Sequence, residues 1–166
     1  MIASLDTCFI IDWARYRNRR ILEEIFEHGY VVEEILNEVK SESAVAYLGE
    51  LMARDFLVIY PFRSALNDIV KNAVQLSMAE PQIRVIDPPE ALALAIAVRE
   101  NCVCVTENRG VLELVRIHPD RFNVSVWRSY EILKEADRMG VIENLSEKLA
   151  NYEKDTRHMF PRRENR

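Results

Sequence analysis

Glycine, cysteine and histidine are scarce in this 166-residue sequence, which contains four, three and three of them. With so few glycines and no low-complexity segment there is no visible linker, and the length predicts a single domain. No segment approaches the roughly 18 uninterrupted apolar residues that a membrane-spanning helix needs. Asp6 and Asp12 interrupt the basic-then-apolar pattern of a secretory signal, so we expect a cytoplasmic protein.

The cysteines show no C-x-x-C zinc spacing, and three of them cannot all pair with one another. Cys102 and Cys104 lie two positions apart in CVCVT, which places them on one face of a strand, and Cys8 is expected nearby. We expect reduced, buried thiols, with a redox or metal role as the alternative.

Acidic residues outnumber basic ones, and the formal net charge of −5 argues against a protein that holds nucleic acid mainly by bulk attraction. Basic residues gather in the segment RYRNRR and in the tail from Thr156 to Arg166. Their arginines are Arg15, Arg17, Arg19 and Arg20 in the first, and Arg157, Arg162, Arg163 and Arg166 in the second. Both clusters are interpreted as either solvated surface or phosphate contacts at the rim of a site.

Short apolar segments alternate with helical patterns along the chain. Residues 4–12 (SLDTCFIID) are expected to form a strand that turns into a helix ending at Gly29, a glycine placed like a helix C-cap. Further strands are expected at 30–32, 56–61, 102–106 and 122–127, an extended segment at 83–86, and helices at 33–55 (broken near Ser41–Ser43), 63–80, 88–101, 109–117, 129–140 and 143–155. This alternation predicts an α/β sandwich with a mainly parallel, five-stranded sheet.

Acidic side chains follow several of the expected strands, and ligands of such sheets bind at the carboxyl ends of the strands. Asp6 closes the first strand, Glu38 lies in the helix after the second, and Glu90 opens the helix before CVCVT. Glu107 and Asn108 follow CVCVT directly. If the first and fourth strands are adjacent, these groups meet at one edge. Clustered carboxylates repel one another unless a divalent cation lies between them, and oxygen-only ligands suit Mg²⁺ or Mn²⁺.

Most of these acids also have an ordinary structural explanation. Asp87, Pro88 and Glu90 fit a helix capping box, which local pattern alone favours over metal binding. Glu38 suits a helix surface, and Glu107 suits the start of a helix. Asp6 has the weakest such explanation, because a charge on a buried strand needs a partner. Asp12 is expected to start a helix rather than to bind a metal. Thr7 and Thr106 either orient a ligand or water, or cap helices.

The chain resembles the PIN-domain family of metal-dependent ribonucleases over most of residues 1–142, with a C-terminal helix and basic tail at 143–166 in the same domain. Four blocks carry the resemblance: SLDTCFIIDW, VVEEILNEV, PPEALALAIAVRENCVCVTEN and SVWRSYEILKEADRMGVI. No single block is specific, but their order and spacing together are.

The resemblance implies a Rossmann-like three-layer α/β/α sandwich in which Asp6, Glu38 and Glu90 bind Mg²⁺ or Mn²⁺. It implies hydrolysis of RNA, often by the toxin of a VapBC-type toxin–antitoxin pair. Two positions depart from the family pattern. The first is the third acid, which is Glu90 rather than the commoner Asp. The fourth position falls on the neutral Asn108, with Glu107 beside it as a possible ligand, which puts two-metal occupancy in doubt.

On this hypothesis the cation binds a phosphodiester oxygen and lowers the pKa of a coordinated water, which attacks phosphorus. An alternative is a catalytically impaired PIN-like scaffold that binds RNA or protein. A small phosphate-binding domain is a weaker alternative, because no glycine-rich loop follows a strand. The expected partners are RNA, an antitoxin that inserts a peptide or arginine into the acidic crevice, and a second copy of the chain. Ile21, Ile25 and Phe26 are candidates for the contact with that copy, although burial in the core explains these apolar side chains as well.

Overall fold

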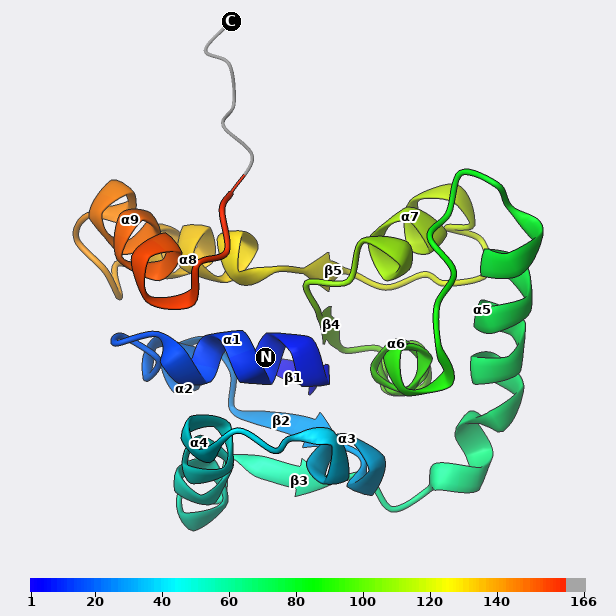
Figure 1. The fold of residues 1–166 in the computed structure, drawn as a ribbon, viewed down its shortest axis with the longest axis horizontal. Coiled ribbons are helices and arrows are strands. Elements are labelled where there is room, and N and C mark those ends of the chain that lie inside the picture. The colour runs from blue at the N-terminus through cyan, green and yellow to red at the C-terminus, as the bar shows by residue number, and fades with distance from the viewer. Residues whose placement is uncertain (161–166) are drawn as a thin grey trace, which may run out of the picture.

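The computed structural model describes residues 1–160 and contains one sheet of five parallel strands (Figure 1). The strands are β1 (Ile2–Leu5), β2 (His28–Val31), β3 (Leu57–Ile59), β4 (Val103–Val105) and β5 (Val126–Trp127). Their order in the sheet is β3-β2-β1-β4-β5, so β1 and β4 are neighbours in the middle. The condition set for the acidic residues to lie at one edge, that the first and fourth strands are adjacent, is therefore met.

Helices lie on both sides of the sheet. They are α1 (Thr7–Arg15), α2 (Ile21–Ile25), α3 (Glu33–Glu38), α4 (Glu42–Ala53), α5 (Asn67–Ala79), α6 (Pro88–Glu100), α7 (Arg109–Ile117), α8 (Ser129–Arg138) and α9 (Leu145–Thr156), with a 3₁₀ turn at Arg63–Leu66. Helix α6 packs on β1 and β4 with α5 and α7 beside it, while α1, α2, α4, α8 and α9 gather on the other side (Figure 1). The predicted three-layer α/β/α arrangement is present.

The centre of the fold is apolar on both sides of β1. Helix α6 is buried along its whole middle, from Ala91 to Ala97, because its alanines let it lie close against the sheet. On the other side, Trp13 of α1 stacks with Phe9, and Tyr152 of α9 contacts Trp13 and, edge to face, Tyr16, the residue that ends α1. This aromatic group ties the C-terminal helix to the first helix of the chain.

The first strand is shorter than the sequence suggested. It ends at Leu5, and Asp6 caps α1 by accepting a hydrogen bond from the Thr7 amide at 2.8 Å. The prediction of a strand reaching residue 12 was wrong, because the apolar residues from Cys8 onward are helical. Asp12 lies inside α1 rather than at a helix start, and its carboxylate is 3.9 Å from Arg15.

Gly29 is not a helix C-cap. The chain breaks between α1 and α2, and Gly29 lies within β2, where it pairs with Ala3. A Cβ there would come within 2.7 Å of Leu5 Cδ1 and 3.2 Å of Phe56 Cε1, so any larger residue would have to displace these two side chains. The break between α3 and α4 was predicted correctly, with Ser41 capping α4. The segment 83–86 lies outside the sheet.

Two further expectations need correction. All three cysteines are free, and Cys104 is buried, but Cys8 is exposed. Ile21, Ile25 and Phe26 were candidates for a dimer surface, yet their side chains are buried in the core of a single chain.

In the described part of the chain no helix is long and apolar enough to cross a membrane.

Candidate active site

Asp6 is a buried carboxylate at the carboxyl end of the central strand, with 2% of its surface exposed. One oxygen accepts a hydrogen bond from the Thr7 amide, and the other accepts one from the Thr106 hydroxyl, both at 2.8 Å. The Asp6 amide donates to Val105 at the end of β4, so the two chain segments leave the sheet side by side. The sheet therefore holds Asp6 in one fixed position.

The surroundings of Asp6 disfavour its charge. Burial raises the pKa of the carboxyl group, and the negative charges of Glu90 and Glu38 raise it further, while the hydrogen bonds from Thr106 and Thr7 lower it. The balance raises the pKa to about 6. The charge of Glu90, more than 80 positions away in the sequence, therefore acts on the Asp6 carboxylate.

Glu38 is linked to Asp6 through Thr7. Its carboxylate accepts a hydrogen bond from the Thr7 hydroxyl at 2.9 Å, while the Thr7 amide donates to Asp6. Glu38 is the last residue of α3 and is exposed, so this one hydrogen bond orients it toward the start of α1. Thr7 thus contacts both acids and does more than occupy the first position of a helix.

Glu90 performs the capping function that the local sequence pattern favoured. One of its oxygens accepts a hydrogen bond from the Asp87 amide at 2.9 Å, three residues earlier. This bond fixes Glu90 at the first turn of α6, from which its charge acts on Asp6. Capping uses one carboxylate oxygen, so the ligand role of Glu90 stays a prediction.

Asn108 caps α7. Its side-chain oxygen accepts from the amides of Gly110 at 2.8 Å and Val111 at 3.2 Å. Its own amide donates to the Thr106 hydroxyl at 2.9 Å, and that hydroxyl donates to Asp6. Asn108 is therefore connected to Asp6 through Thr106, in a position that supports the site.

The side chain of Glu107 is largely buried and directed toward α8. One oxygen accepts from the amide of Ser129 at 2.8 Å and from its hydroxyl at 2.5 Å. The other oxygen is 3.5 Å from His158 Nε2, and the opposite ring nitrogen of His158 is 3.8 Å from Asp12. Burial raises the pKa of Glu107, and the facing His158 lowers it. The hydrogen bonds of Glu107 thus connect β4 to the C-terminal part of the fold.

This second network, which also includes a hydrogen bond between the hydroxyls of Ser129 and Tyr152, was not foreseen from the sequence. Ser129 directly follows the last strand and its flanking Arg128, so the rule that drew attention to Asp6 could have found it. His158 has no local signal, because only the fold brings it to Glu107.

A cation fits the first network by its chemistry. In the part of the chain that the structure describes, no three His, Cys, Asp or Glu side chains are arranged to hold a metal ion. Mg²⁺ keeps several of its waters, however, and usually takes only one or two protein carboxylates. The raised pKa of Asp6 is the observation that favours a fit, since a nearby cation would stabilise the charged form. Asp6, Glu38 and Glu90 supply only oxygen donors, as Mg²⁺ and Mn²⁺ prefer.

The arginine clusters contribute little to this site in the described residues. Arg17 forms a two-pronged pair with Asp155, and Arg19 pairs with Glu50, which favours the solvated-surface interpretation for RYRNRR. Arg162, Arg163 and Arg166 lie outside the described residues.

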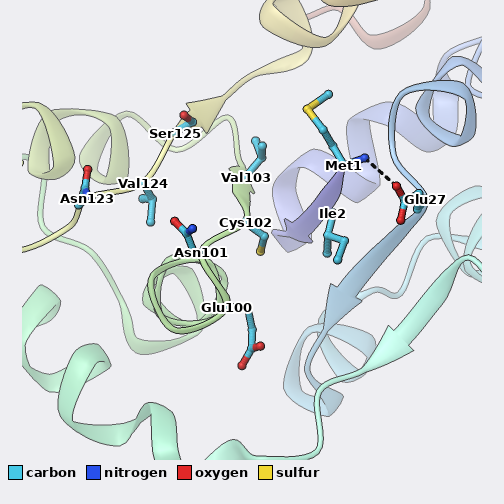
Figure 2. A pocket seen from close by; sticks show the side chains of 10 residues that line it. All are labelled: Met1, Ile2, Glu27, Glu100, Asn101, Cys102, Val103, Asn123, Val124 and Ser125. Atoms are coloured by element: carbon cyan, nitrogen blue, oxygen red, sulfur yellow. Dashed lines mark hydrogen bonds and ion pairs between the residues drawn. The ribbon is translucent and has the colours of Figure 1, made fainter.

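A pocket of about 550 Å³ lies at the opposite end of the sheet (Figure 2). Its lining comes from the amino ends of the strands, including Ile2 of β1, Val103 of β4 and Ser125 before β5. The Met1 amino group pairs with Glu27 at its edge. None of the predicted site residues lines this pocket, so the acidic site and the pocket are separate.

A scan against protein-family models finds no match, and neither does a search of curated proteins. Among solved structures, the chain is similar to a chain from the crystal structure of VapBC2 from Rickettsia felis bound to a DNA fragment from their promoter. The match has a TM-score of 0.50 at 16% sequence identity and covers 77% of this chain and 98% of the other. The chain has a PIN-like fold, with the all-parallel sheet order β3-β2-β1-β4-β5 that this fold displays, and the predicted fold class is confirmed.

Proposed function

We propose that this chain is a divalent-cation-dependent ribonuclease in which Asp6, Glu38 and Glu90 hold Mg²⁺ or Mn²⁺. The observation that carries the proposal is the buried Asp6 carboxylate at the carboxyl edge of a PIN-like sheet, with two further acids raising its pKa. Capping α1 explains the hydrogen bond from Thr7 to Asp6 but not the nearby like charges, because a buried charge beside like charges destabilises the fold.

The residues around the acids have distinct tasks in this proposal. When bound, the cation supplies charge neutralisation at a phosphodiester and activation of a water. The Thr106 hydroxyl receives the Asn108 amide, so its proton is directed at Asp6 and fixes the orientation of that carboxylate. Thr7 does the same for Glu38. None of the three histidines is needed as a general base in this scheme.

We further infer a protein partner. The likeness to a chain of VapBC2 supports the toxin of a toxin–antitoxin pair as the class, and the RNA substrate would place its action in the cytoplasm. An antitoxin segment that places an arginine among the acids would neutralise them in place of the cation. A second copy of the chain is also expected, but the surface that it would use is not the buried Ile21 and Ile25.

The direct test is cleavage of a short unstructured RNA by the purified chain. We expect cleavage with Mg²⁺ or Mn²⁺ and none in excess chelator, with Asp6→Asn as the control for contaminating nuclease. Activity that persists in chelator, or that survives unchanged in Asp6→Asn, contradicts the proposal. Binding of RNA without cleavage under any cation would favour the scaffold alternative.

A further inference from the structure

We propose that the site around Asp6 takes a single divalent cation, because the end of β4 supplies no carboxylate to it. This inference rests on the proposed function and adds the stoichiometry of the site. It follows from where Asn108 and Glu107 direct their oxygens.

The oxygen of the Asn108 side chain is already occupied. It accepts two backbone amides at the start of α7, those of Gly110 at 2.8 Å and Val111 at 3.2 Å. The other terminal atom of the side chain is a nitrogen, which carries two N–H donors and offers no lone pair to a cation. Asn108 therefore supports Thr106 through its own amide without acting as a ligand.

Asn108 also has little freedom to turn. The start of α7 lies close to the chain before α6, where a Cβ on Gly110 would come within 2.4 Å of the Arg84 carbonyl oxygen. The cap and the helix that it begins are therefore fixed against neighbouring backbone. Releasing the Asn108 oxygen toward a metal would leave two helix amides without their acceptor.

Glu107 is the adjacent acid, but it does not substitute for the missing carboxylate. Its side chain is only 6% exposed, and one oxygen receives both the amide and the hydroxyl of Ser129. The other faces His158 at 3.5 Å. To reach a cation at Asp6, Glu107 would have to leave the Ser129 amide without its acceptor and give up the bond from the Ser129 hydroxyl, which would keep only its bond to Tyr152, and this loss opposes the movement.

The charges of the three acids also fit a single divalent cation. Asp6, Glu38 and Glu90 together carry three negative charges, which one dication reduces to one. A second cation would need ligands from the β4 end, where the structure places an amide and a committed carboxylate. Aspartate caps helices as well as asparagine does, so Asn108→Asp should keep the cap and add a carboxylate oxygen beside Thr106.

Counting bound Mn²⁺ tests the inference without measuring activity. Calorimetric titration of the full chain, with free Mn²⁺ followed by electron paramagnetic resonance, is expected to give one ion per chain. Asn108→Asp should bind two, whereas the matched Asn108→Ser, which keeps a capping oxygen but adds no charge, should bind one. Glu107→Gln should also bind one, because its oxygens take no part in the site.

Two ions in the wild-type chain, one ion in a folded Asn108→Asp variant, or a loss of binding in Glu107→Gln would each overturn the inference. If circular dichroism shows that Asn108→Asp does not fold, the wild-type and Glu107→Gln counts still decide. An absence of any Mn²⁺ binding by the wild-type chain would overturn the proposed function itself, and is thus distinguishable from a count of two.

Discussion

Asp6 directly follows β1 and Glu107 lies two residues beyond the neighbouring strand β4, and both side chains are largely buried, yet their surroundings differ. Asp6 faces two more carboxylates and is held by two threonines. Glu107 faces a histidine and receives two hydrogen bonds from Ser129. Among the described residues, Asp6 thus has further acids and no cation beside it, whereas Glu107 has one oxygen on Ser129 and the other, which receives no hydrogen bond, beside His158. A strand-end carboxylate thus indicates a cation site only when its neighbours leave it uncompensated.

The largest expected difference between the two acids is in catalysis. Asp6→Asn should lower RNA cleavage by at least about a thousandfold, because a loss of roughly 4 kcal/mol of transition-state stabilisation has that effect. Glu107→Gln should stay within about threefold of the wild-type rate, since it removes no ligand. Initial rates at saturating Mn²⁺ measure both. Equal losses in the two variants would break the distinction drawn here.

For the free energy of unfolding we expect the opposite order, with a larger loss from a change at Glu107 than from Asp6→Asn. Glu107→Ala leaves the amide of Ser129 without an acceptor, while its hydroxyl keeps the bond to Tyr152, and should lower the free energy of unfolding by about 1–3 kcal/mol. Asp6→Asn should leave stability equal or higher, because it removes a buried charge among like charges. Urea unfolding in chelator at neutral pH measures both values. A larger loss in Asp6→Asn than in Glu107→Ala would show that Asp6 is the structural residue.

The dependence of stability on pH sharpens the description of Asp6. Its pKa is raised from 3.8 to about 6 in the folded chain, so the contribution of this group is complete below about pH 4 and is lost as the pH rises through 6. About two pKa units correspond to roughly 3 kcal/mol, so Asp6→Asn should gain up to about that much on the wild-type chain between acid and neutral pH. Unfolding curves of the wild-type chain and of Asp6→Asn, recorded without metal at each pH, give the difference in their free energies of unfolding. A difference that stays constant with pH would contradict the raised pKa.

A smaller effect, on the affinity for Mn²⁺, is expected when the Thr106 hydroxyl that orients Asp6 is removed. Thr106→Val keeps the shape of the side chain but removes its hydrogen bond to Asp6, and should weaken Mn²⁺ binding by about 10–100-fold. Thr106→Ser retains the hydroxyl and serves as the matched control, with affinity close to wild type. Calorimetry compares the three chains. Wild-type affinity in Thr106→Val would mean that Thr106 only terminates β4.

The sheet and the influence of Glu38 and Glu90 on Asp6 could be predicted, because the alternation of strands and helices and the carboxyl-end rule depend on patterns that the sequence displays. The extent of the first strand could not. A short apolar run such as CFII is compatible with a buried strand or a buried helix, and the Asp6 cap decided for a helix. Ile21, Ile25 and Phe26 illustrate the same limit, since an apolar side chain does not reveal which surface covers it.

The direction of Glu107 was beyond sequence reasoning for a different reason. Its partners Ser129 and His158 come from distant parts of the chain, and their pairing depends on how α8 and α9 pack on α1. Glu90 lies between these cases, because its capping bond is local and was foreseen, while its effect on Asp6 required the fold.

Thermal unfolding with and without Mn²⁺ tests most directly whether the acids around Asp6 form a cation site. A ligand that binds only the folded chain raises its unfolding temperature. At neutral pH we predict that Mn²⁺ raises the unfolding temperature of the wild-type chain and of Glu107→Gln but leaves Asp6→Asn unchanged. An equal rise in Asp6→Asn, or no rise in the wild-type chain, would contradict the account.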